Sequence, residues 1–222
     1  MAGVQFSHTP SFCNEVDFMG KNVFEKIFEL ATPYLKEGKP EDFIHASSVK
    51  ASVELFADNA SQLDILIPFA ILHDAGNSVV LPEDFHYIQG KTIVENGKLF
   101  HGLAGAKIAY KILTSVDYNK DQIRAIVDLI KIHDFDDLEL FKTRSWQIAR
   151  DADILDRMNV ERLKGMMKTR NLTAIQILDL VKTQVPCFFS EKARDEFNKR
   201  QQVLFDELKI DKKYWITPKM VE

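Results

Sequence analysis

Hydrophobic residues recur at helical spacing along almost the whole chain, and β-branched runs that alternate strictly with polar residues are nearly absent. This pattern predicts an all-α protein. A first helix is expected from about residue 14 to 36, where Gly38 and Pro40 follow as stop signals. A helix after Pro40 comes next. A third, at about 62–75, is apolar on all sides, which is typical of the buried centre of a helical bundle.

Helical spacing returns after residue 100. Between residues 77 and 100 the pattern breaks, with Pro82, Gly90 and Gly97, and connections of this length in a compact domain are often functional. We interpret this segment as a flap over a site. The later helices are expected to give support or a subunit contact, as in a homodimer. Helices are predicted at about 101–109, 121–134, 145–158, 160–167, 173–182 and 190–208.

The length of 222 residues predicts one domain over residues 1–222. Its core is expected at about 41–168, with the N-terminal helix and C-terminal helices at about 172–209 packed on it. A net charge of -4 gives no overall basic field, so we do not expect nucleic acid as a partner. No apolar run is long enough to cross a bilayer. Two distant cysteines outside any CxxC pattern favour a reducing, cytoplasmic location.

Histidines bring candidate chemistry into this helical pattern. A lone histidine on an apolar face is ordinarily a core residue whose ring nitrogens are satisfied. Four such residues together with Asp74 and Asp153 change the picture, because a carboxylate in apolar surroundings needs a cation or a donor network to offset its desolvation. A metal ion would supply that cation. The four histidines at helix ends or on apolar helices are His45, His73, His101 and His133.

The order of these residues resembles the pattern of the HD-domain superfamily. It comprises His45, the doublet within Ile71-Leu72-His73-Asp74-Ala75-Gly76, His101-Gly102-Leu103-Ala104-Gly105-Ala106, Ile132-His133-Asp134 and Ala152-Asp153-Ile154-Leu155-Asp156. The resemblance covers about residues 43–160. It implies a helical bundle of the HD-domain type.

The resemblance also implies a ligand set. His45, His73, Asp74 and Asp153 would hold one divalent metal ion. His101 and His133 would hold a second, with Asp74 as the bridge. Imidazole and carboxylate suit iron, manganese, zinc, cobalt or nickel, so the metal remains open.

The activity that the resemblance implies is metal-dependent hydrolysis of a phosphoester, such as a nucleotide or a related small phosphorylated compound. Asp74, His101 and His133 would take part at the reacting atoms. Lys107 and Arg157 are the first candidates for cations that touch the substrate, and Asp134 could assist proton transfer. Asp151 is expected either to orient a histidine or to lie exposed. Further candidates are the cations Lys50, Arg144 and Arg150 and the flap residues Glu83, Asp84, His86 and Tyr87.

Two other functions stay open at this point. The same six ligands resemble those of HD-domain proteins that activate dioxygen at an iron pair. A site of this kind could also stabilise a non-catalytic module that senses a nucleotide. The ligand types do not separate these functions from hydrolysis.

Overall fold

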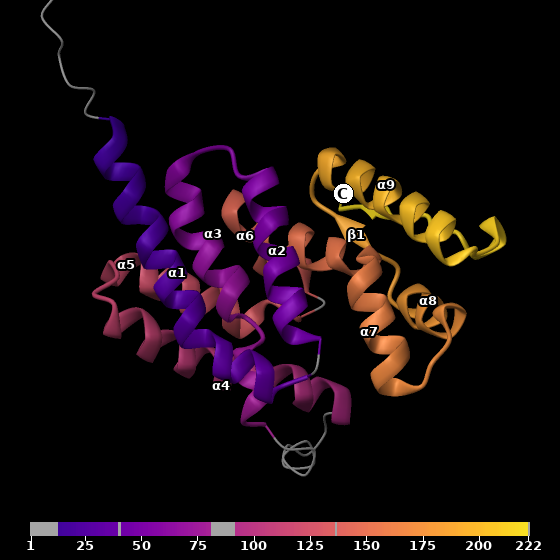
Figure 1. The fold of residues 1–222 in the computed structure, drawn as a ribbon, viewed down its shortest axis with the longest axis horizontal. Coiled ribbons are helices and arrows are strands. Elements are labelled where there is room, and N and C mark those ends of the chain that lie inside the picture. The colour runs from indigo at the N-terminus through magenta and orange to yellow at the C-terminus, as the bar shows by residue number, and fades with distance from the viewer. Residues whose placement is uncertain (1–12, 40, 81–91, 136, 222) are drawn as a thin grey trace, which may run out of the picture.

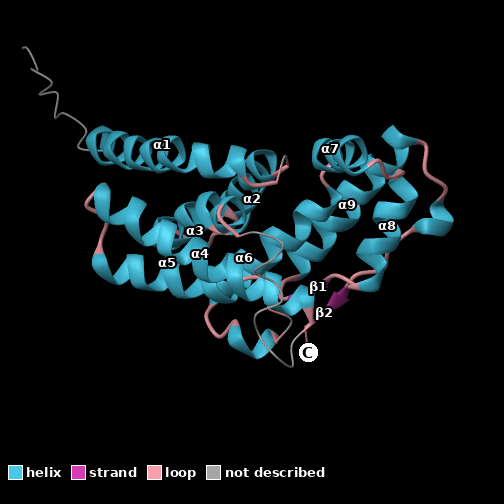
Figure 2. Cartoon of the chain, turned by 90° about the horizontal axis from the view of Figure 1, so that it is seen from below, coloured by secondary structure: helices cyan, strands magenta, loops and turns pink. Residues whose placement is uncertain are grey.

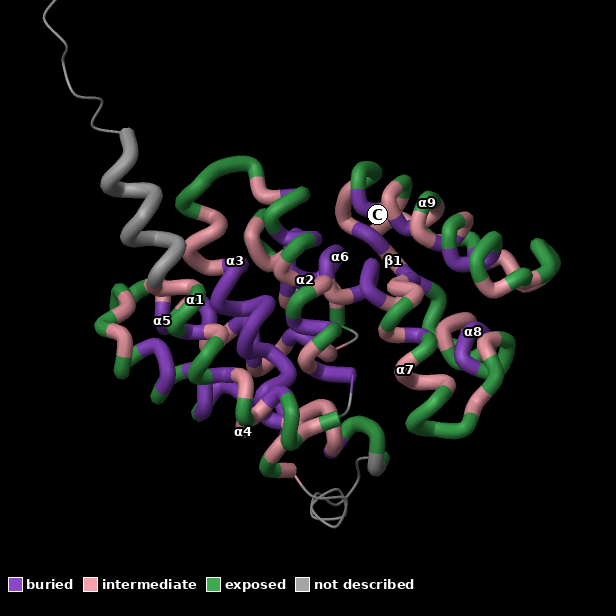
Figure 3. The backbone as a smooth tube through the Cα atoms, viewed as in Figure 1, coloured by how far each residue is buried: buried purple, intermediate pink, exposed green. Residues whose placement is uncertain are grey.

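The most apolar stretch of the chain forms the centre of a helical bundle. α3 (Ala60–Leu72) is buried at every residue from 66 to 72, and Figure 3 shows this half of the helix among buried neighbours. It contacts α1 (Cys13–Glu37) and α2 (Asp42–Phe56) and three helices that follow it in the chain. The computed structural model describes residues 13–39, 41–80, 92–135 and 137–221. Over these residues the predicted all-α class is confirmed.

The other helices fall into two groups along the molecule. α4, α5 and α6 complete the bundle around α3, and α7, α8 and α9 lie together at the opposite end from α5 (Figures 1 and 2). Their bounds are α4 (Ile93–Ser115), α5 (Lys120–Ile132), α6 (Arg144–Leu155), α7 (Val160–Arg170), α8 (Ala174–Thr183) and α9 (Glu191–Leu208). Short 3₁₀ helices occur at Ala75–Ser78, Leu138–Leu140, Asp156–Met158 and Lys212–Tyr214.

Polar side chains begin many of these helices by accepting a hydrogen bond from a backbone N–H of the first turn. Such caps satisfy amide groups that have no partner within the helix. At α4 the cap is a capping box, in which Thr92 and Glu95 bond each other's backbone N–H. The other side-chain caps are Asn59, Asn119, Thr143, Asn159, Thr173 and Ser190.

The flap predicted over residues 77–100 is wrong at both of its ends. The Ala75–Ser78 3₁₀ helix occupies its start, and α4 occupies residues 93–100, with Gly97 inside the helix. The capping box of Thr92 outweighs the helix-weakening effect of this glycine. Residues 81–91 lie outside the described residues, and with them the four candidate flap residues.

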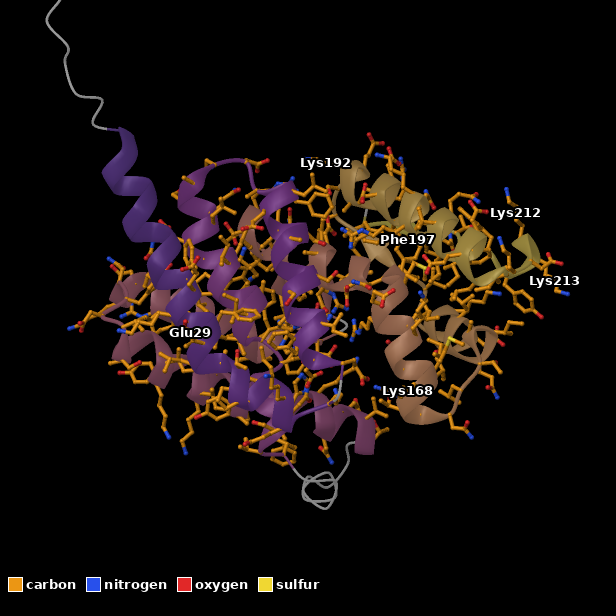
Figure 4. The ribbon with its side chains drawn as sticks, viewed as in Figure 1. Glu29, Lys168, Lys192, Phe197, Lys212 and Lys213 are labelled. Atoms are coloured by element: carbon orange, nitrogen blue, oxygen red, sulfur yellow. The ribbon has the colours of Figure 1, made fainter. Side chains whose placement is uncertain are left out.

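The prediction for Asp151 is also wrong. This carboxylate is fully buried in α6, where it accepts hydrogen bonds from the backbone N–H groups of Phe189 and Ser190 and from the Ser190 hydroxyl. It therefore neither lies exposed nor contacts a histidine of the described chain. It holds the start of α9 against α6. Nearby, Phe197 of α9, which is labelled in Figure 4, packs against Phe188 with ring centroids 5.4 Å apart.

Two very short strands were not predicted. β1 (Cys187–Phe188) pairs in parallel with β2 (Lys219–Met220), which fastens the end of the chain beside α9. Two residues are too few to show an alternating pattern. Among the described helices, none is long and apolar enough to span a membrane.

Gly76 is expected to be essential for the packing of the Ala75–Ser78 3₁₀ helix on α4. A Cβ atom here would collide with the His101 carbonyl oxygen and approach the Gly105 amide nitrogen to 2.5 Å. Gly76→Ala should therefore lower the free energy of unfolding by about 1–3 kcal/mol. Gly165→Ala is the control, because no atom lies within 4 Å of that Cβ position inside α7. It should raise stability by about 0.5–1 kcal/mol. Urea unfolding of both variants measures the difference, and an unchanged Gly76→Ala would contradict this packing.

Candidate metal centre

Five helices direct one or two polar side chains each into the interior of the bundle. His45 comes from α2, His101 from α4 and Asp153 from α6. His73 and His133 lie at the C-caps of α3 and α5, and Asp74 follows His73 directly. α3 ends at Leu72, three residues before the predicted end, so that His73 and Asp74 stand at the helix terminus. All four histidines and Asp74 are buried.

The first donor cluster centres on His45. Its Nε2 atom lies 2.9 Å from His73 Nε2 and 3.1 Å from Asp153 Oδ1. Asp74 Oδ2 lies 3.5 Å from the same His45 nitrogen and 3.7 Å from His73 Nε2. His45, His73 and Asp74 thus place one ligand atom each within 4.8 Å of one another, and Asp153 lies beside the two histidines of this group.

The second donor cluster lies on the other side of Asp74. His101 Nε2 and His133 Nε2 are 3.2 Å apart, and Asp74 Oδ1 lies 3.7 Å from each of them. The two oxygens of Asp74 therefore face different clusters. This carboxylate has the position of a bridge between two sites.

The outward ring nitrogen of each histidine is committed to an acceptor. The Nδ1 atoms of His73, His101 and His133 lie 2.7–3.1 Å from backbone carbonyl oxygens of their own helices, those of Ala70, Gly97 and Ile130. A carbonyl oxygen cannot donate, so each Nδ1 carries the proton. His45 Nδ1 bonds Asp156 Oδ2 at 2.6 Å. In the neutral rings, all four Nε2 lone pairs consequently point inward.

Inward lone pairs at these separations require a positive charge between them. Two neutral Nε2 atoms would repel at 2.9 or 3.2 Å. Ligands bound at about 2.0–2.2 Å from one ion lie roughly 3.0–3.5 Å from each other, which is close to the separations seen here. The donor set therefore fits one or two divalent ions, and its nitrogen and oxygen atoms do not select a particular metal.

The pKa values of the four histidines also indicate a positive charge between the facing rings. Burial and Arg162 both oppose protonation of His45, but hydrogen bonds to Asp153 and Asp156 outweigh them and raise its pKa to about 9. Burial lowers the pKa of His73 to about 4. In the second cluster, burial lowers the pKa of His101, whereas for His133 the hydrogen bond to Asp74 overcomes burial and raises the pKa. In each pair one ring is therefore the favoured site for an additional proton, at the place where a cation would bind.

The contact of Asp156 with the donor cluster was not predicted. This residue lies in the 3₁₀ helix after α6 and is fully buried. Its Oδ2 atom bonds His45 Nδ1 and also accepts a hydrogen bond of 2.9 Å from the guanidinium of Arg162 on α7. Burial alone would raise the Asp156 pKa, but the bond to His45 lowers it below its ordinary value. The position three residues after Asp153 is the signal in the sequence, since residues i and i+3 share a helix face.

A pocket of about 270 Å³ adjoins the donor clusters. His45, Asp74, His133 and Asp153 form its inner end. Side chains from several elements add charge to its wall. They are Lys39, Asp134, Arg157, Arg162 and Arg170.

The rest of the wall comes from α7 and α8, for which support or subunit contact was predicted. The structure gives both helices a place at the site. Their apolar residues in the pocket are Leu163, Met166, Ile177, Leu180 and Val181.

Of the candidate cations, some line the pocket and others lie away from it. Arg157 lines the pocket. Lys107 does not, because it lies on the exposed side of α4, so its prediction as a substrate contact is not supported. Lys50 and Arg144 form ion pairs elsewhere, with Glu54 and Asp58.

Two further candidates lie close to the histidines. Arg150 is buried and donates to the backbone carbonyl of His133 at 2.9 Å. It therefore supports the end of α5. Asp134 lines the pocket, with Oδ2 3.9 Å from His101 Nε2.

Comparison of the chain with models of protein families, with curated proteins and with solved structures gave no match. The case for a metal centre therefore rests on the donor geometry itself.

Metal binding should release protons. Below a pH of about 9, His45 carries a proton that must leave before its Nε2 can bind an ion. The apparent affinity for Mn²⁺ or Zn²⁺ should therefore rise with pH by about tenfold per unit from pH 7 to 9 for each proton displaced, and level off above that range. Titration calorimetry at pH 7.5 in two buffers of different ionisation enthalpy counts the protons. Release of none would contradict the charge assignment.

Asp156→Asn should weaken metal binding by about 10–100-fold, because the amide keeps the size of the side chain but loses the charge that holds His45 in position. Competition with a chromophoric chelator measures the affinity. Asp151→Asn is the matched control. Asp151 is also a fully buried carboxylate of the same region, but it bonds Phe189 and Ser190, so its variant should keep the affinity. An equal loss in both variants would indicate general damage to the fold.

Proposed function

We propose that this protein is a metal-dependent phosphohydrolase of the HD-domain superfamily that acts on a small phosphorylated compound. The observation that carries the proposal is the bridging position of Asp74 between two histidine pairs, next to a pocket with basic walls. The order of the six donors along the chain is the order of the HD pattern. His45, His73, Asp74 and Asp153 would hold one ion, and Asp74, His101 and His133 a second.

Divalent ions at such a site lower the pKa of a bound water and neutralise phosphoryl oxygens, the two services that phosphoester hydrolysis needs. The protein's own groups would orient the substrate. Arg157 donates to the Gln184 carbonyl at 3.2 Å and forms no ion pair with the described residues, so its guanidinium has donors left for a phosphoryl group. Arg162 adds a second cation. Its Nε is buried without a hydrogen-bond partner among the described residues.

Asp134 would serve proton transfer. Its carboxylate lines the pocket and is about one-third exposed, so a bound substrate can reach its Oδ2. It lies beside His101 without entering either donor cluster. We therefore assign it the proton that the leaving group takes up as its bond to phosphorus breaks.

An iron-pair oxygenase would use the same six donors, and a sensing module would keep them without turnover. The basic wall favours a phosphorylated ligand in either case. Turnover that requires Fe²⁺ and dioxygen would select the oxygenase. Uniform inactivity with retained nucleotide binding would select the module.

Purified protein loaded with Mn²⁺, Co²⁺ or Fe²⁺ should release inorganic phosphate from some members of a panel of nucleotides, dinucleoside polyphosphates and an aryl phosphate. Asp74→Ala should abolish this activity and reduce the number of ions bound, because both donor clusters lose their shared carboxylate. Metal content by mass spectrometry accompanies each assay. Full activity of Asp74→Ala would refute the assigned site.

Arg157→Gln should raise KM by about tenfold or more with a smaller change in kcat, as expected for loss of a charge-assisted hydrogen bond to the phosphoryl group. Lys168→Gln is the control, since Lys168 is an exposed cation on α7 (Figure 4) that does not line the pocket. Equal effects of the two variants would show that only long-range charge matters.

A further inference from the structure

We infer that the substrate is an alkyl phosphomonoester, whose carbon chain lies on α8 while its phosphoryl group lies at the metal centre. This inference rests on the proposed function and narrows its substrate class. In the reaction a water oxygen bonds to phosphorus, the P–O bond to the carbon chain breaks, and the alcohol leaves with a proton. Inorganic phosphate remains, and no oxidant or reductant takes part.

One face of α8 supplies the apolar surface for the chain. Ile177, Leu180 and Val181 are spaced i, i+3 and i+4, so they lie on the same side of the helix, and all three line the pocket. Leu180 is 53% exposed there. A single exposed leucine is ordinary, but this one continues an apolar wall inside a pocket that has metal-site donors at its other end. An apolar group of the substrate would cover it.

α7 joins the two ends of the pocket. Arg162, Met166 and Arg170 are spaced four residues apart and form one stripe of the helix, with Leu163 beside them. Arg162 bonds Asp156 and so stays near the metal centre. Arg170 pairs with Glu41 at the start of α2. α7 thereby lies between α2 and α8 (Figure 1), and its Leu163 and Met166 add apolar side chains to the pocket that α8 lines.

The character of the wall favours an aliphatic group over a nucleobase. Proteins commonly hold unpaired bases by stacking them on aromatic rings and by bonding their polar edges. Within the described part of the chain, no Phe, Tyr or Trp lines this pocket, and Gln184 is its one neutral polar residue. A base or a ribose would leave its polar atoms against Ile177, Leu180 and Val181, which costs free energy. An alkyl chain has no such atoms.

The pocket volume also favours a small substrate. At about 270 Å³ it is slightly below the range of roughly 300–1,000 Å³ that is common for sites of drug-sized ligands. A dinucleoside polyphosphate would extend far beyond it. A phosphoryl group with a short carbon chain matches this space and a lining that includes both cations and aliphatic side chains.

The test uses alkylphosphonates, which bind as phosphate esters do but are not hydrolysed. Calorimetry of the Mn²⁺-loaded protein with methyl-, butyl- and hexylphosphonate should show a Kd that falls by about tenfold or more from methyl to butyl, since each buried methylene contributes up to about fourfold. Leu180→Asn should raise the Kd of hexylphosphonate by about fivefold and leave the Kd of methylphosphonate unchanged. Leu55→Asn, at a leucine 45% exposed on α2 outside the pocket, is the matched control and should have no effect.

Hydrolysis of the matching alkyl phosphates and of adenosine monophosphate is measured alongside. If hydrolysis occurs but chain length changes neither Kd nor kcat/KM, the inference fails and the proposed function stands. Preference for the nucleotide over hexyl phosphate likewise overturns the inference alone. If no phosphate is hydrolysed and no phosphonate binds, both the inference and the proposed function fail. Chain-length-dependent binding without hydrolysis would refute the hydrolase, and with it the alkyl phosphate as a substrate, and would leave only an alkyl-binding pocket.

Discussion

The organisation of this protein depends on a positive charge held between buried imidazole and carboxylate groups. Four histidines turn Nε2 inward because their other nitrogens are bonded to acceptors, and an apolar bundle surrounds them. Neither facing pair is stable with two neutral lone pairs in contact, so a proton or a metal ion has to be present at each. These buried groups thus form two candidate cation sites joined by Asp74.

Hydrogen bonds at helix ends lower the free-energy cost of burying these histidines. The last carbonyl groups of a helix lack partners within it, and His73 and His133 bond such carbonyls, three residues back, from the C-caps of α3 and α5. One hydrogen bond thereby satisfies an orphan acceptor, fixes the tautomer and aims the ring. The close approach of α4 at Gly76 and Gly105 brings His101 to the same depth. The same backbone contacts therefore pack the helices and place the donor side chains.

Much of the fold was predictable because helical periodicity is a local property. The all-α class, the start of α2 and the approximate extents of α1 and of α5 to α9 follow from it. The start of α4 was missed although Thr92 and Glu95 carry the spacing of a capping box. The six donors could be selected only as an ordered set, since a lone histidine has an ordinary core role. Long-range packing was not predictable: it determines that Asp151 anchors α9, that Lys107 points to solvent, and that α7 and α8 enclose a pocket.

The chain from Arg162 through Asp156 to His45 connects that pocket wall to the donor cluster. The bond to His45 and the guanidinium of Arg162 both favour the ionised form of Asp156, and the next turn of the helix that carries Arg162 contributes apolar residues to the pocket wall. A shift of α7 would therefore alter both the space for a ligand and the charge behind a metal-binding ring. The ion pair of Arg170 with Glu41 restrains the other end of α7 against α2. α7 is therefore held at both ends, to Asp156 beside the donor cluster and to Glu41 of α2, while Leu163 and Met166 between them line the pocket.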